Sequence, residues 1–218
     1  NKTLGIIGLG NVGSEVARRA HGLEMRLIAY DPFIAADHAR NSQVELVPIK
    51  QLLAESDFIT LHIPLTKATK GLIGTKEMAL LKPMVRIINT ARGRLINEVA
   101  LVKAVKEKRI AGAAFDVFET EPLTSSILFE DDNIIVTPHL GASTTEAQAL
   151  VAKHVAEQVV AIFKEQPARY AVNAPFISPE TLSVLAPFVK AASIVGRLVS
   201  QLVKGQMSSI QIKYDGEI

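Results

Sequence analysis

The chain has 218 residues, of which 48% are hydrophobic and 21% charged, and its 24 basic residues nearly balance its 22 acidic ones. The formal charge is +2 and no long run of like charges occurs, so we expect no nucleic-acid partner. The absence of cysteine excludes disulfides, thiolate metal sites and thiol nucleophiles, and we expect no metal. No apolar stretch approaches the roughly 18 residues of a membrane helix, so we expect no membrane partner and a cytoplasmic globular protein.

Short runs of apolar and β-branched residues alternate with helical patterns along most of the chain. We expect strands at Thr3–Gly8, Arg26–Tyr30, Val44–Val47, Asp57–His62, Val85–Asn89, Ile110–Asp116 and Ile134–Thr137. Several of these runs are almost continuously apolar, which is typical of parallel strands covered on both faces. Strands that alternate with helices indicate an α/β fold with a doubly wound parallel sheet.

The first predicted strand runs into a glycine-rich turn, Gly8-Leu-Gly10-Asn-Val-Gly13, which opens a helical pattern. In this setting Gly8 permits a tight turn, Gly10 lets the backbone approach a pyrophosphate, and Gly13 allows close packing of helix on strand. Asp31 closes the next strand, where it would accept hydrogen bonds from the ribose hydroxyls of a dinucleotide. No basic residue follows it directly, so NAD is favoured over NADP. The alternative is that Asp31 forms a turn before Pro32, and both roles are compatible.

Three polar segments follow later predicted strands. In a doubly wound sheet, residues just beyond the carboxyl ends of the strands line the ligand crevice. This places Arg92, Glu121 and His139 around one site. A guanidinium binds a carboxylate through two hydrogen bonds, and an imidazole exchanges protons near neutral pH. The set is therefore suited to hydride transfer, with Arg92 holding a substrate carboxylate and His139 as acid and base.

Glu121 is expected to support His139. The histidine precedes a helix that begins near Ser143, and a helix N-terminus disfavours an imidazolium. A carboxylate hydrogen-bonded to the ring opposes this effect and fixes the tautomer. Glu119 is the rival for this role. Structural alternatives remain for Arg92, as a loop arginine, and for His139, as a capping or core histidine.

The character of the chain changes after Gln166. Prolines at positions 167, 175 and 179 predict a boundary, and a long apolar helix and an extended run at Ile210–Tyr214 follow. We expect a dinucleotide-binding domain at residues 1–172, including a helix that returns to a substrate domain, and part of an intervening domain at residues 173–218. Because the sequence opens and closes on predicted strands, we expect it to be a piece of a longer protein.

The motifs at 8–13, 89–93, 115–122 and 137–142 together resemble those of the D-isomer-specific 2-hydroxyacid dehydrogenases, over residues 3 to about 175. The resemblance implies NAD as cofactor, a small 2-hydroxy acid as substrate and a homo-oligomer. It makes Arg92, Glu121 and His139 the catalytic set. It places cofactor contacts on Gly8, Gly10, Asn11, Val12, Gly13, Asp31, Ile63, Thr90, Asp116 and Gly141.

The C-terminal part resembles that of long family members that oxidise 3-phosphoglycerate to 3-phosphohydroxypyruvate in serine biosynthesis. The alternatives within the class are a hydroxypyruvate or glyoxylate reductase and a D-lactate dehydrogenase. An alternative of another class is an NAD-binding corepressor-like protein. Arg94 departs from the family pattern, because many members have a second glycine there. We expect it either to face solvent or to add a phosphate contact.

Overall fold

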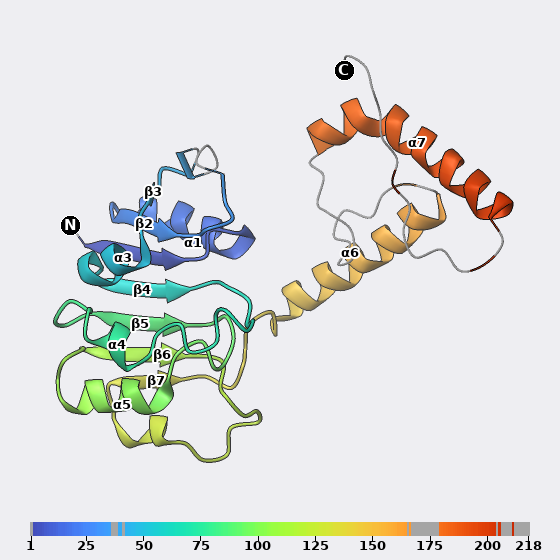
Figure 1. The fold of residues 1–218 in the computed structure, drawn as a ribbon. Coiled ribbons are helices and arrows are strands. Elements are labelled where there is room, and N and C mark those ends of the chain that lie inside the picture. Colours follow the sequence, from blue (N-terminus) through green and yellow to red (C-terminus); the bar gives the residue numbers. More distant parts are fainter. Residues whose placement is uncertain are drawn as a thin grey trace. The chain divides into compact units, whose positions relative to one another are not determined.

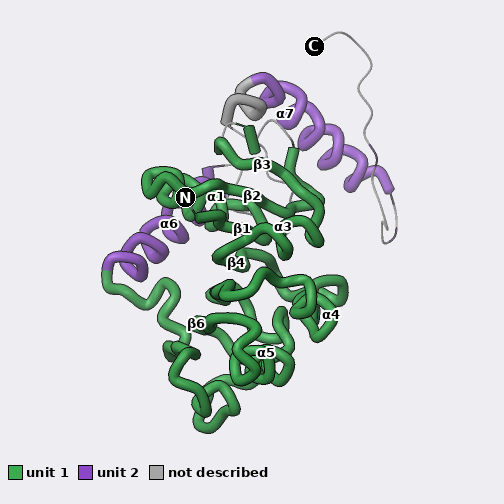
Figure 2. The backbone as a smooth tube through the Cα atoms, turned by 90° about the vertical axis from the view of Figure 1, so that its left-hand side faces the viewer, with its two compact units in different colours: residues 1–145 green, residues 146–218 purple. Residues whose placement is uncertain are grey.

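The computed structural model describes residues 2–35, 39–40, 42–164, 166, 179–203, 205 and 211. Its contacts divide the chain into two compact units, residues 1–145 and residues 146–218 (Figure 2). The first unit contains all the strands of the described chain, and the candidate site lies within it.

The first unit is built on one seven-stranded parallel sheet with the strand order β3-β2-β1-β4-β5-β6-β7. The prediction of a doubly wound α/β fold is confirmed, and each of the seven predicted strands is present. In Figure 1 the strand arrows all point the same way, so their carboxyl ends form one edge. The strands are β1 (Thr3–Ile7), β2 (Arg26–Tyr30), β3 (Glu45–Leu46), β4 (Phe58–Leu61), β5 (Arg86–Asn89), β6 (Gly112–Phe115) and β7 (Ile134–Val136).

Helices cover both faces of this sheet, which is why its strands are apolar on both sides. Ile6 and Ile7 are both fully buried, but they belong to two different cores. Ile6 packs in the core that includes α1 residues, and Ile7 packs in the core that includes residues of α3, α4 and α5. Figure 2 views the sheet along its strands, with α1 on one side and α3 and α4 on the other. The helices are α1 (Asn11–His21), α3 (Ile49–Glu55), α4 (Thr75–Met78), α5 (Glu98–Lys106) and the short 3-10 helix η1 (Ile127–Glu130).

The order of the strands reverses at β1, which pairs with β2 on one side and β4 on the other. The helices that follow β1 and β4 pack on opposite faces of the sheet. Ligands of open parallel sheets bind at this switch point. The glycine-rich turn leaves β1 at this position.

The second unit contains two helices in its described part. Helix α6 spans Thr145–Phe163, from the end of the first unit, and α7 spans Pro179–Leu202 with Pro187 inside it. The predicted long apolar helix is therefore present. The predicted extended run at 210–214 falls outside the described residues except for position 211, and the predicted boundary between 172 and 173 falls outside them altogether. The domain limits given from the sequence remain predictions.

Within α7, the stretch Val184–Leu202 is long and apolar enough to cross a membrane by length and composition. The expectation that no stretch approaches this length is therefore wrong. The two charged residues, Lys190 and Arg197, interrupt the apolar run without lowering its mean hydropathy enough to exclude a span. One helix of this kind is weak support for a membrane, because core helices of globular proteins pass the same test.

Asp57 connects three strands of the first unit, β1, β4 and β5, at their amino ends. Asp57, just before β4, accepts hydrogen bonds from the Thr3 backbone N–H and from Lys82 Nζ, both at 2.9 Å, and Lys2 Nζ lies 3.5 Å away. The Asp57 backbone also accepts a hydrogen bond from the Arg86 N–H at the start of β5. The hydrogen bond from Thr3 and then that from Lys82 lower the pKa of Asp57 to about 2.

We expect Asp57→Asn to lower the free energy of unfolding by about 2 kcal/mol at pH 7, because the shift from 3.8 to about 2 measures how strongly the fold favours the carboxylate. A folded-state pKa below the ordinary value gives stability that is present above about pH 4 and is lost as the pH falls towards 2. Urea titrations across this range measure the effect. Glu45→Gln is the control, since its pair with Arg26 is about half exposed and water screens it, so its loss is expected to change stability little. Equal losses in the two variants would contradict the assignment.

Candidate active site

Two glycines of the first turn are required by the packing of the chain itself. Gly8 has φ +94°, its N–H donates to the Tyr30 carbonyl at 3.0 Å, and a Cβ there would lie 2.6 Å from the His62 carbonyl oxygen. A Cβ on Gly13 would clash with the Gly8 carbonyl oxygen. The predicted tight turn and the predicted close approach of α1 to β1 are both observed.

Gly10 differs from these two glycines, because, its own chain neighbours aside, no described atom lies within 4 Å of the position of a Cβ there. It is the N-cap of α1, and Asn11 and Val12 after it are exposed. The first-turn N–H groups of a helix have no partner within the helix, and α1 has no acidic residue in its first turn. The open space and the first-turn N–H groups form a surface suited to an anionic group such as a pyrophosphate.

Asp31 lies beside this turn at the end of β2. Its Oδ2 accepts a hydrogen bond from the Leu9 N–H and its Oδ1 accepts one from the Phe33 N–H, both at 2.9 Å. The bond from Phe33 forms the turn that we expect of an aspartate before proline. The bond from Leu9 holds the carboxylate against the glycine-rich turn. Each oxygen keeps a lone pair, and the side chain is only partly buried, so it can still accept from a ribose hydroxyl. Ile63 is partly buried, and its side chain lies against Gly8.

The loop after β5 presents Arg92 through a buried amide. Asn89 is 1% exposed, its Nδ2 donates to the Arg92 carbonyl at 2.9 Å, and its Oδ1 accepts from the Ala91 N–H at 3.1 Å. Gly93 packs so closely on the Phe118 carbonyl that a Cβ would overlap it. Arg92 and Thr90 are exposed on this fixed loop, and the Arg92 guanidinium donates to the Ala91 carbonyl at 2.6 Å.

Asp116 organises the loop that carries the candidate histidine. Its carboxylate accepts hydrogen bonds from Thr137 Oγ1 at 2.5 Å, the Leu140 N–H at 2.7 Å and the Gly141 N–H at 2.9 Å. Burial alone would raise the pKa of Asp116, but these three hydrogen bonds outweigh it and the pKa is lowered. Asp116 is therefore ionised, and the Gly141 amide that we assigned to the cofactor is already engaged by it.

His139 and Glu121 form the hydrogen-bonded pair expected from the sequence. His139 Nδ1 lies 2.7 Å from Glu121 Oε2, and Glu121 Oε1 accepts from the Phe118 N–H at 3.0 Å. The hydrogen bond to His139, and then that from Phe118, lower the pKa of Glu121. A carboxylate only accepts, so the proton of the pair lies on Nδ1 and Nε2 remains available.

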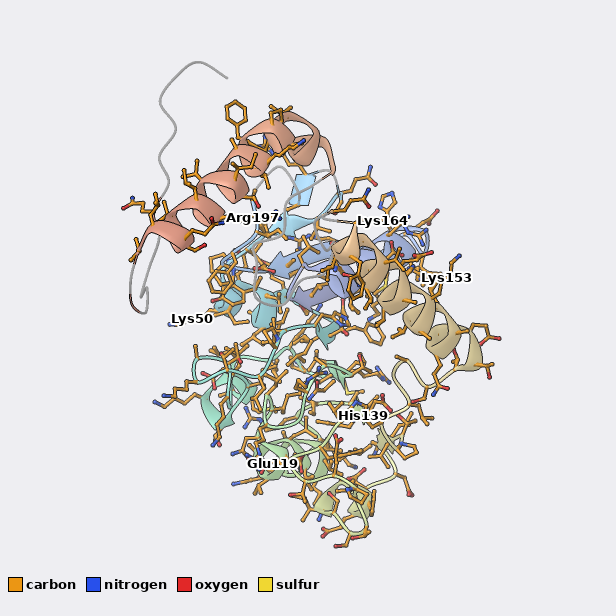
Figure 3. The ribbon with its side chains drawn as sticks, turned by 90° about the vertical axis from the view of Figure 1, so that its right-hand side faces the viewer. Lys50, Glu119, His139, Lys153, Lys164 and Arg197 are labelled. Carbon is orange, nitrogen blue, oxygen red and sulfur yellow. The ribbon has the colours of Figure 1, made fainter. Side chains whose placement is uncertain are left out.

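The rival carboxylate, Glu119, has no hydrogen bond to His139 in the described chain, and its backbone N–H donates to Glu98 Oε1. Figure 3 labels Glu119 and His139, which lie on the segments that follow β6 and β7. Glu121, and not Glu119, is therefore the partner of the histidine.

Arg92, Glu121 and His139 line one cavity of about 320 Å³. Its walls come from the segments that follow β4, β5, β6 and β7, as expected for residues beyond the carboxyl ends of neighbouring parallel strands. A larger, mainly apolar cavity of about 510 Å³ also has Glu121 and His139 in its wall. Among the described residues no group of three or more His, Asp or Glu side chains could hold a metal ion.

The sequence prediction missed the residues that position this site. Asn89 was recognised only as part of a motif, and Asp116 only as a cofactor contact, although each holds a loop in place. Thr137 and Phe118 were not singled out as partners of these carboxylates. The one available signal was the position of Asn89 and Asp116, polar residues at the end of apolar strands.

Residues 1–141 match the family model described as D-isomer specific 2-hydroxyacid dehydrogenase, NAD binding domain. The chain is 48% identical over 217 residues to D-3-phosphoglycerate dehydrogenase from Synechocystis sp., and 44% identical over 218 residues to D-3-phosphoglycerate dehydrogenase from Methanocaldococcus jannaschii. Both alignments cover 100% of this chain but only 39% and 42% of those proteins. The chain thus spans about two fifths of the length of these relatives.

Solved structures give the same fold. The holo form of Rhodotorula graminis D-mandelate dehydrogenase matches with a TM-score of 0.75 at 32% identity, covering 81% of this chain and 52% of that one. D-lactate dehydrogenase with NAD⁺ from Lactobacillus jensenii matches with a TM-score of 0.72 at 29% identity, covering 80% of this chain and 56% of that one.

Gly10 and Gly93 make a matched pair of substitutions. Gly93→Ala is expected to lower the free energy of unfolding by about 1–3 kcal/mol or more, because the new Cβ meets the Phe118 backbone. Gly10→Ala is expected to cost under about 1 kcal/mol, because its Cβ meets nothing, but to weaken NADH binding about tenfold by filling the space beside the helix N-terminus. Urea unfolding and NADH fluorescence titration measure the two effects. Unchanged NADH affinity in stable Gly10→Ala would place the dinucleotide elsewhere.

Proposed function

Because this chain belongs to the D-isomer specific 2-hydroxyacid dehydrogenase family, whose NAD binding domain it contains, we propose that the full-length gene product transfers a hydride between NAD and a D-2-hydroxy acid. The observation that carries the proposal is the His139–Glu121 pair at 2.7 Å, in the wall of the cavity that Arg92 also lines. This set supplies an acid and base, its positioning carboxylate and a cation.

The chemistry follows from the protonation of the pair. Glu121 fixes the proton on Nδ1, so Nε2 of the neutral ring is the base that takes the hydroxyl proton of the 2-hydroxy acid during oxidation. The ring is then an imidazolium, which the ionised Glu121 stabilises beside it. In the reverse direction the same Nε2–H protonates the carbonyl oxygen. Arg92 binds the substrate carboxylate through two parallel hydrogen bonds from its planar guanidinium and so orients the carbinol carbon.

The dinucleotide site fits NAD. Bound NAD would supply the hydride acceptor, and the chain would hold it by the free N–H groups of the first turn of α1 and by Asp31. The carboxylate of Asp31 can accept hydrogen bonds from ribose hydroxyls but disfavours a 2′-phosphate, which favours NAD over NADP. The unfilled space beside Gly10 is the observation that supports a close approach of the pyrophosphate.

The substrate that we propose is 3-phosphoglycerate, oxidised to 3-phosphohydroxypyruvate in the first step of serine biosynthesis. The support is that relatives matching all of this chain at 40–48% identity are named D-3-phosphoglycerate dehydrogenase. Solved structures with the same fold carry the names of glyoxylate reductase and D-lactate dehydrogenase, so these substrates belong in the same assay. A homo-oligomer in the cytoplasm is part of the proposal, on the family resemblance alone.

The test is the turnover of the full-length gene product with 3-phosphoglycerate and its variants. His139→Ala is expected to lower kcat about 10³-fold while NADH affinity stays unchanged, because the proton acceptor is lost and the dinucleotide site is not. Glu121→Gln is expected to lower kcat less, since the base remains but its charged partner is gone. Glu45→Gln, on β3 and outside the wall of this cavity, is the control and should leave kcat unchanged. A His139→Ala enzyme with wild-type turnover would overturn the proposed role.

We expect residues 1–218 alone to bind NADH with negligible dehydrogenase activity. Arg92 and His139 are exposed in the described chain, whereas catalysis of this kind needs a site that excludes water. NADH fluorescence titration and reduction of 3-phosphohydroxypyruvate, measured on the same preparation, test both parts. Robust turnover would show that the site is complete within these residues.

A further inference from the structure

Arg94 is held by its backbone in a conformation that its side chain does not favour. Its φ of +64° lies in the left-handed region, which residues other than glycine seldom adopt. The surrounding hydrogen bonds impose it: the Gly71 N–H donates to the Arg94 carbonyl at 2.8 Å and the Ile73 N–H donates to the Leu95 carbonyl at 3.2 Å. Leu95 is fully buried immediately afterwards, so the loop cannot relax freely.

The side chain of Arg94 makes no polar contact with the described part of the fold. It is exposed, and it has no hydrogen bond or ion pair with any residue that the structure describes. Arg94 instead lines the cavity of about 320 Å³ that Arg92, Glu121 and His139 also line. The Arg94 guanidinium lies at the candidate active site and has no partner among the described residues, so it is available to an anionic ligand.

Among the charged residues that line this cavity, one cation has no role assigned to it so far. Glu121 is engaged by His139 and by the Phe118 N–H, and Arg92 is assigned to the substrate carboxylate. The remaining charged groups in the wall are Arg94 and Glu119. Glu119 would repel a second anionic group on the substrate, so that group needs a cation close to it.

Arg92 and Arg94 flank Gly93, so their Cα atoms are separated by at most about 7 Å. 3-Phosphoglycerate carries a carboxylate at one end and a phosphate at the other, on a chain of three carbons. Two guanidiniums at this spacing can each take one of these groups, and a guanidinium binds phosphate through two parallel hydrogen bonds.

We propose that Arg94 is a specificity-determining residue, which binds the phosphate of a phosphorylated 2-hydroxy acid while Arg92 binds its carboxylate. The inference rests on the proposed function. It adds a phosphate contact supplied by the dinucleotide-binding unit itself, on the loop after β5.

The experiment compares two substrates of the full-length gene product, 3-phosphohydroxypyruvate and hydroxypyruvate, which differ only in the phosphate. Arg94→Gln is expected to raise KM for the phosphorylated substrate about 10- to 100-fold, because a charge-assisted pair is lost, and to leave KM for hydroxypyruvate within about twofold. Arg94→Lys should keep more of the affinity than Arg94→Gln, since lysine retains the charge but cannot form two parallel hydrogen bonds to the phosphate. Arg92→Gln should impair both substrates.

Lys103→Gln is the control for net charge. It removes one positive charge from an exposed position on α5, outside the wall of the cavity, and should change neither KM. Arg94→Gly separates charge from backbone conformation, because it removes both the guanidinium and the strain. It should repeat the substrate effect of Arg94→Gln.

Two results would overturn the inference, and they are distinguishable. If the wild-type enzyme prefers the phosphorylated substrate and Arg94→Gln keeps that preference, the proposed function stands and Arg94 has no part in it. If the wild-type enzyme uses hydroxypyruvate as well as 3-phosphohydroxypyruvate, the assignment to phosphoglycerate fails, and the role of Arg94 fails with it.

Discussion

The geometry of the site depends most on the hydrogen bonds that the Asp116 carboxylate accepts. It lies at the end of β6, almost fully buried, and accepts three hydrogen bonds from the segment between Thr137 and Gly141. His139 lies in the middle of this segment with φ +53° and an exposed side chain, so nothing in its own packing fixes its position. The buried anion on the neighbouring strand does so, and a rigid sheet thereby determines where an exposed imidazole lies.

Contacts between adjacent loops extend this control across the site. Gly93 is pressed against the Phe118 carbonyl, the Phe118 N–H holds Glu121, and Glu121 holds His139. The loop with Arg92 is therefore connected to the histidine through one intervening segment, the one that follows β6, and not through solvent. Parallel strands about 4.8 Å apart bring such loops into contact, although they are distant in the sequence. The arrangement requires glycine at position 93, since any side chain would separate the loops.

The sequence was sufficient for the parts of the structure that depend on local pattern. Continuous apolar runs such as Phe58–Leu61 identified the strands, and the spacing of the glycines identified the turn before α1. It was insufficient where the outcome depends on distances across the fold. Glu119 and Glu121 lie two positions apart just before Pro122, and only the three-dimensional path of the loop decides which one contacts the histidine. The roles of Asn89 and Asp116 in holding loops, and the backbone conformation of Arg94, are likewise consequences of tertiary packing that no local pattern reveals.

His139 and Glu121 lie in the wall shared by the cavity that Arg92 lines and a larger, mainly apolar one. Water in the apolar cavity screens the charges of this pair, whereas hydrocarbon in its place lowers the local dielectric and strengthens their attraction. Any group that fills that space would therefore strengthen the hydrogen bond between Glu121 and His139 without touching the reacting atoms.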